Sequence, residues 1–150
     1  MLTKVTGLRR WKPFGWGSGP VRFKPWDEAA DWLSTLSASY PALKPHLDIV
    51  ESVIIADAQH RLGLITSMTD LIVFHRATGE PPYDPVFVNI LPVTSGKEAW
   101  VRIWHCSFTG HDDRIDVPPA KAVAAFWRFM HYKFDVLPKR LGVGVRGVIS

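Results

Sequence analysis

The stretch VFVNIL at residues 86–91, followed by WVRIWHCSFT at residues 100–109, decides the fold of this chain. Both runs are rich in β-branched and aromatic residues, which favour strands. The link TSGK at residues 94–97 has turn chemistry and predicts an antiparallel hairpin. GHDD at residues 110–113 is a second turn signal, which leaves a short strand at 114–117. The sequence therefore predicts an antiparallel β-meander over about residues 86–117.

A helix is expected directly after this meander, over residues 119–137. Pro118 and Pro119 suit the first turn of a helix, where a missing N–H does no harm. Apolar residues then recur at helical spacing, at Val123, Phe126, Trp127, Met130, Phe134 and Leu137. A single helix cannot leave such a stripe in water, so this helix should cover one face of the hairpin.

Two further helices are predicted before the strands, which makes the fold class α+β. Residues 26–39 follow Pro25 and carry acidic residues in their first turns. Residues 46–78 show no sustained alternation of apolar and polar residues, so a helix that ends at Gly79 is favoured over strands. Such a helix would be roughly 45 Å long, so we expect either a break near Gly63 or a projecting end.

The composition indicates a soluble globular protein. A chain of 150 residues is one domain in length, and its hydrophobic content of 47% excludes a disordered chain. No apolar run approaches the roughly 20 residues of a membrane helix, and the N-terminus lacks the apolar core of a secretory signal. Cys106 is the only cysteine, so no intrachain disulfide can form. A reducing compartment, the cytoplasm, is therefore expected.

The net charge of +4 is unevenly distributed along the chain. Residues 1–24 hold six basic residues and residues 138–150 hold three, and neither segment contains an acidic residue. The remainder has fourteen acidic and nine basic residues. This pattern divides the chain into an extended basic, aromatic arm (1–25), a single α+β domain (26–137) and a basic Gly/Val tail (138–150).

Possible catalytic or metal-binding side chains gather around the second turn: His105, Cys106, His111, Asp112 and Asp113. A phosphate-binding cysteine loop would need an arginine six residues after Cys106, but Arg114 comes two residues later than that. The possible metal donors match no established ligand spacing. We therefore expect an ordinary polar turn without metal or cofactor, with Cys106, His111 and Asp113 as the catalytic alternative.

Asp57, Arg61 and His75 form a second constellation. On the helix expected at 46–78 they lie within the apolar stripe, and Asp57 and Arg61 are spaced to pair at i and i+4. Charges on a buried face need partners. An internal ion network is thus the first interpretation, and the floor of a pocket is the second.

Trp100, Arg102 and Trp104 share one face of the strand at 100–109. If that face were exposed, it could stack on bases, sugars or the side chains of a partner. If the C-terminal helix covered that face, its side chains would belong to the hydrophobic core. We predict that they belong to the core, although Arg102 argues against complete burial.

The basic termini carry the predicted partner-binding residues: Arg9, Arg10, Trp11, Lys12, Trp16, Arg22, Lys24 and Arg146. Basic residues interleaved with aromatic ones suit an acidic protein surface and also a nucleic-acid backbone. No Walker loop, dinucleotide fingerprint or nucleophile elbow occurs in the sequence.

These features predict a non-enzymatic protein-binding or assembly protein that docks through its termini. It would be a component of a larger particle, an adaptor, or an inhibitor or immunity-type protein, with a protein partner or a homo-oligomer. Nucleic-acid binding through the same termini is the alternative. A small metal-dependent hydrolase or nuclease that uses the His105–Asp113 turn is the second alternative.

Overall fold

Five strands form one antiparallel sheet in which each strand lies beside the next one in the chain. The structure is a computed structural model that describes residues 22–76, 85–91, 98–106 and 112–138. The strands are β1 (Leu62–Ser67), β2 (Asp70–His75), β3 (Val86–Ile90), β4 (Val101–Cys106) and β5 (Asp112–Val117). β1 and β5 are thus the edge strands.

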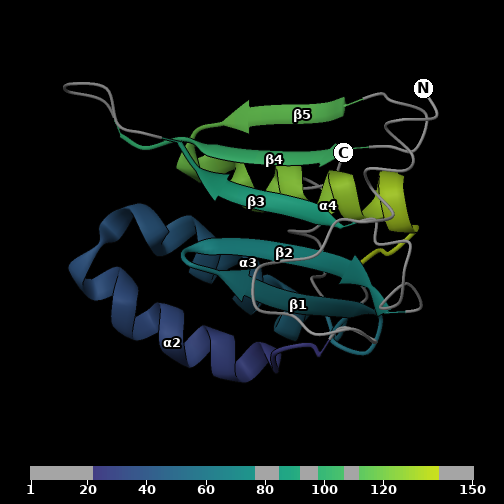
Figure 1. Ribbon diagram of the computed structural model, residues 1–150, viewed down its shortest axis with the longest axis horizontal. Helices are drawn as coiled ribbons and strands as arrows, with labels where there is room; N and C mark the ends of the chain where they lie inside the picture. Colours follow the sequence, from purple (N-terminus) through teal and green to yellow (C-terminus); the bar gives the residue numbers. More distant parts are fainter. Residues whose placement is uncertain (1–21, 77–84, 92–97, 107–111, 139–150) are drawn as a thin grey trace.

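Three α-helices accompany the sheet in the described ranges: α2 (Trp26–Ser39), α3 (Lys44–Ile55) and α4 (Ala122–Phe134). Helices α3 and α4 lie behind the strands in Figure 1, on a single face of the sheet, and α2 packs against α3 beside β1. The 3-10 turns η1 (Pro41–Leu43) and η3 (Pro119–Lys121) lead into α3 and α4. No helix in this part of the chain is long and apolar enough to cross a membrane.

The predicted α+β class is confirmed, and so is a helix that packs on the sheet. The helix expected at 26–39 is α2, the meander expected at about 86–117 is β3 to β5, and the helix expected at 119–137 is η3 followed by α4. Alternation along each strand gives the sheet two faces. We call the face covered by α3 and α4 the inner face and the opposite one the outer face.

The helix predicted over residues 46–78 is wrong, because α3 ends at Ile55 and is followed by β1 and β2. The backbone of Asp57 is left-handed, with φ of 57°. The N–H of Asp57 donates to the carbonyl of Ile54, and the N–H of Ala58 donates to that of Val53. These two bonds form a Schellman motif, which closes the helix even though aspartate stands where glycine is usual.

Strands β1 and β2 show no alternation in the sequence because both of their faces are buried. Their inner-face side chains join the main core with α3 and α4, namely Leu62, Leu64, Leu71 and Val73. Their outer-face side chains Ile65, Ile72 and Phe74 form a second buried cluster. A strand that is apolar on both sides reads as a continuous apolar run and resembles a buried helix.

The N-terminal residues of the described chain seal the free edge of β1. The N–H of Lys24 donates to the carbonyl of Leu64 at 2.7 Å, and Nε1 of Trp26 donates to that of Leu62 at 2.9 Å. The ring of Phe23 lies over Gly63, so close that a Cβ added there would be 2.5 Å from it. Residues 22–26, the edge segment, therefore occupy hydrogen-bonding positions that would otherwise be open to another strand.

His46, near the start of α3, lies wholly inside the main core, with 0% of its surface exposed. Neither ring nitrogen completes a hydrogen bond of ordinary geometry within the described structure. Burial disfavours the charged imidazolium and lowers the pKa of His46 to about 4, while the nearby backbone of Val88 opposes this shift. The folded protein therefore keeps His46 neutral over a pH range in which the unfolded chain protonates it.

Replacing Gly63 by alanine should lower the free energy of unfolding by about 1–3 kcal/mol, because the new methyl group and the ring of Phe23 cannot occupy the same space. In a Phe23→Ala background the same substitution should cost much less. Equilibrium urea unfolding of the four proteins in this double-mutant cycle measures the difference. An equal cost of Gly63→Ala in both backgrounds would contradict the contact.

Acid should destabilise the protein through His46. Because its folded-state pKa is depressed, stability is complete above pH 6.5 and is lost as the pH falls from 6.5 to about 4. The shift corresponds to about 3 kcal/mol at most. Urea unfolding at several pH values measures the free energy of unfolding. Between pH 6.5 and about 4 this free energy should fall by about that amount less in His46→Leu than in the parent. An equal pH dependence of the free energy of unfolding in His46→Leu and in the parent would contradict this account.

Candidate binding surface

The outer face of the sheet changes character from β1 to β5. On β1 and β2 it is closed, since Ile65, Ile72 and Phe74 are 7%, 3% and 0% exposed. Phe23 and Phe87 pack against these three residues. On β3, β4 and β5 the described outer-face side chains are half-buried or exposed. Neither α3 nor α4 covers them, because both helices lie on the inner face.

An aromatic pair occupies the middle of the open half. Phe87 on β3 lies directly across from Trp104 on β4. Their rings stack with centroids 4.4 Å apart and an interplanar angle of 15°. Nε1 of Trp104 donates a hydrogen bond to Oδ1 of Asn89. The stacking and this bond together fix the orientation of the indole, so the pair is a preorganised apolar surface.

Beside the aromatic pair lies a two-pronged ion pair. Arg102 on β4 is the cross-strand neighbour of Asp116 on β5. Nε and one terminal nitrogen of Arg102 donate to the two carboxylate oxygens at 2.8 and 3.0 Å. This hydrogen bonding is the main reason that the pKa of Asp116 is held below its ordinary value. The two charges therefore satisfy each other within the sheet.

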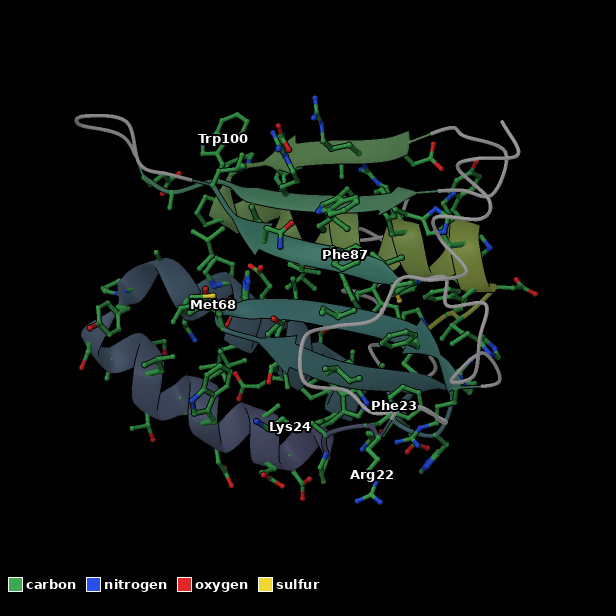
Figure 2. All side chains as sticks on the ribbon, viewed as in Figure 1. Arg22, Phe23, Lys24, Met68, Phe87 and Trp100 are labelled. Carbon is green, nitrogen blue, oxygen red and sulfur yellow. The ribbon has the colours of Figure 1, made fainter. Side chains whose placement is uncertain are left out.

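The open half is bounded by exposed side chains. Arg114 is the cross-strand neighbour of Trp104 and is exposed. Trp100 precedes β4, continues the alternation of Arg102 and Trp104, and is 44% exposed. In Figure 2 Trp100 and the 91% exposed Met68 lie at the same end of the sheet, with Phe87 nearer its centre. We call the open half the outer patch: Phe87, Asn89, Trp100, Arg102, Trp104, Arg114 and Asp116.

The prediction that Trp100, Arg102 and Trp104 form core is wrong. Helix α4 packs on the residues between them, Val101 and Ile103, which are 1% and 0% exposed. The physical reason is that these aliphatic side chains interdigitate with the apolar stripe of α4 without burying a cation. Arg102 was the sequence signal for this orientation.

The turn predicted as a possible catalytic site is described only in part. His111 lies outside the described residues, as do the side chains of Cys106 and Asp112. Asp113 forms an ion pair with Lys133 of α4, and His105 is 3% exposed. Among the described side chains, no group of three or more His, Cys, Asp or Glu could hold a metal ion. The catalytic alternative thus stays a prediction that depends on His111.

Asp57, Arg61 and His75 engage separate partners. Asp57 lies 3.3 Å from Nε2 of His60. Arg61 donates to the carbonyl of Leu137 at 2.9 Å, and the ring of His75 meets that of Phe134 edge-on. The pairing of Asp57 with Arg61 expected at i and i+4 is wrong, because the helix that it required ends before Asp57. The contacts of Arg61 and His75 connect the loop after α3 and the end of β2 with the last residue of α4 and the segment that follows it.

Two of the predicted partner-binding residues fall within the edge segment. Arg22 is exposed, and Nζ of Lys24 lies 5.0 Å from the centre of the Trp32 ring on α2. Figure 2 shows both beside β1, at the side of the sheet opposite β5. The others lie outside the described residues: Arg9, Arg10, Trp11, Lys12, Trp16 and Arg146.

Sequence reasoning missed Phe87, Asn89, Arg114 and Asp116 as members of the surface. The signal that could have found them is the register of the hairpins. Once a turn is placed between β4 and β5, antiparallel pairing sets Asp116 across from Arg102 and Arg114 across from Trp104.

Comparison with known proteins adds no relative from which a function could be transferred. No protein-family model matches the chain, and neither a curated protein nor a solved structure matches it.

Replacing Arg102 by glutamine should raise the pKa of Asp116 toward its ordinary value, because the hydrogen bonds that hold it down are lost. A carboxyl with a depressed pKa adds stability above its ordinary pKa, and that stability disappears as the pH falls. Carbon-13 NMR titration of the Asp116 carboxyl measures the change. Arg128, exposed on α4, is the control, and Arg128→Gln should leave the titration unchanged. An unaltered Asp116 pKa in Arg102→Gln would contradict the ion pair.

Proposed function

We propose that this protein is a non-enzymatic protein-binding or assembly protein, and that its partner docks on the outer patch and along the basic termini. One observation carries the proposal: the helical layer of the described structure lies on the inner face, and the outer face of β3 to β5 carries aromatic and arginine side chains that are half-buried or exposed. On this half of the sheet, partly exposed aromatic rings lie beside the ion pair of Arg102 and Asp116.

The chemistry of the outer patch suits a protein partner. Tryptophan and arginine are enriched among the residues that dominate protein–protein binding. Burying a charge without a partner is costly, but Arg102 and Asp116 already pair in two-pronged geometry. A partner can therefore bury Arg102 and Asp116 without leaving either charge unpaired. The stacked Phe87 and Trp104 need little ordering on binding, which lowers its entropic cost.

Nucleic acid is the second candidate, and the basic termini support it. Residues 1–24 carry six basic and no acidic residues, a suitable charge for phosphates. The outer patch adds little to this charge, because Arg102 is already paired with Asp116 and only Arg114 remains as a further cation of the patch. The salt dependence of binding separates the two, because a nucleic-acid complex weakens steeply as salt rises.

The complex should survive gentle purification from the organism's own cells and appear in native mass spectrometry as a stoichiometric protein assembly. Trp100→Ala should reduce the bound fraction by about tenfold, because an exposed tryptophan at an interface supplies much of the binding free energy.

Deleting residues 1–21 should weaken the complex as well. It should leave thermal unfolding nearly unchanged, because the deletion stops short of the Phe23 and Lys24 contacts with β1.

The matched control is Tyr132→Ala on α4, another exposed aromatic side chain at 72% exposure, which should leave the complex intact. An assembly that tolerates Trp100→Ala would disprove docking on the outer patch. A protein recovered without a protein partner, or with nucleic acid as judged by its absorbance ratio, would overturn the protein-binding proposal.

A further inference from the structure

A cleft lies where η1 and the start of α3 meet η3 and the segment that leads into β4. Its volume is about 460 Å³. Most of the described residues that line it are small and apolar: Pro41, Ala42, Pro45, Ala99, Pro119 and Ala120. Sites for small molecules are typically clefts of roughly 300–1,000 Å³ whose lining is mostly apolar. In size and in lining, this cleft therefore suits a small molecule.

Three charged side chains also line the cleft: Lys44, Asp48 and Glu98. Nζ of Lys44 lies 3.0 Å from Oδ1 of Asp48, so these two charges pair with each other. Glu98 is exposed, and no described side chain forms an ion pair with its carboxylate. The described lining thus contains one carboxylate whose charge is not balanced within the cleft.

The cleft lies at the start of a helix, a place where proteins often bind anions through free N–H groups. Here proline is the first residue of η1 and of η3 and the second residue of α3, and proline has no N–H. The N–H of Lys44 already donates to the carbonyl of Pro41. Asp48 and Glu98 would also repel an anion. The lining therefore favours a cation over a phosphate or a carboxylate.

We propose that this cleft binds a small organic cation, a molecule with a compact apolar body and one ammonium group. The apolar body lies on the proline and alanine walls, and the ammonium group pairs with the carboxylate of Glu98. The cleft and the outer patch have no residue in common. The inference therefore goes beyond the proposed function and does not depend on it.

The apolar walls should supply most of the affinity, and Glu98 should supply the preference for a cation. An exposed ion pair strengthens binding by about fivefold at most. The positive end of the α3 dipole works against a cation, which also keeps the preference modest. A ligand of few atoms buries little surface, so its dissociation constant should be in the millimolar range.

Three probes with similar aromatic bodies separate the effect of charge from that of shape. Near neutral pH phenethylamine is a cation, phenethyl alcohol is neutral and phenylacetate is an anion. Proton–nitrogen NMR of the labelled full chain, titrated to about 50 mM of each probe, reports binding through the amides of Ala42, Ala99 and Ala120. Phenethylamine should bind about fivefold more tightly than phenethyl alcohol, and phenylacetate should bind most weakly.

Two variants assign these effects to the cleft. Glu98→Gln should bind phenethylamine no more tightly than phenethyl alcohol, because the ion pair is lost. Ala120→Leu places a larger side chain at an exposed position of the lining and should weaken all three probes by about tenfold. Glu28→Gln is the matched control: it makes the same charge change at the far end of α2 from η1, and it should titrate like the parent.

Any of four results would overturn the inference. The amides of Ala42, Ala99 and Ala120 do not shift with phenethylamine up to about 50 mM. The three probes bind equally well. Glu98→Gln keeps the preference for phenethylamine, or Ala120→Leu binds the probes as the parent does.

Discussion

The requirement that the β1–β2 hairpin bury both of its faces shapes the rest of the structure. Its inner side chains need α3 and α4, and its outer side chains need cover of their own, part of which Phe23 supplies. Strands β3, β4 and β5 carry their buried aliphatic side chains on the inner face, where the helical layer packs on them, and their outer face combines aromatic with polar and charged side chains. In the described structure, the sheet is therefore buried on both faces at β1 and β2, whereas the outer-face side chains of β3, β4 and β5 are half-buried or exposed. The candidate surface is a consequence of this asymmetry.

The sequence predicts those elements whose periodicity is one-sided. Helix α2 and strands β3 to β5 each have one buried and one accessible side, so apolar residues recur with a clear period. The same reasoning fails over residues 46–78, where Leu71 to Phe74 are all buried. Periodicity cannot separate a strand buried on two sides from a buried helix. The end of helix α3 before Asp57 could not be predicted either, because it depends on a left-handed aspartate at a position where glycine is usual.

The location of the candidate surface depends on which face of β4 meets α4. Both faces contain large side chains, and total hydrophobicity favours the tryptophan side as core. The structure places Val101 and Ile103 inside, because aliphatic side chains fill the space against a helix without a cation to desolvate. Arg102 marked the outward face correctly. Asp116 could be identified as the partner of Arg102 only from the register of the β4–β5 hairpin. That register depends on the exact position of the turn, which the sequence does not fix.

The edge segment has a consequence for any contact made by the residues before it. The backbone bond from Lys24 to Leu64 and the packing of Phe23 on Gly63 fix the point at which the preceding chain joins the body, beside the outer face. Under the proposed function, a contact made by the residues before the edge segment would be intramolecular once a partner had docked on the sheet, with an effective concentration of order millimolar. Two contacts that are weak individually would then act as one bivalent attachment. Its strength would depend on the edge segment as much as on either contact.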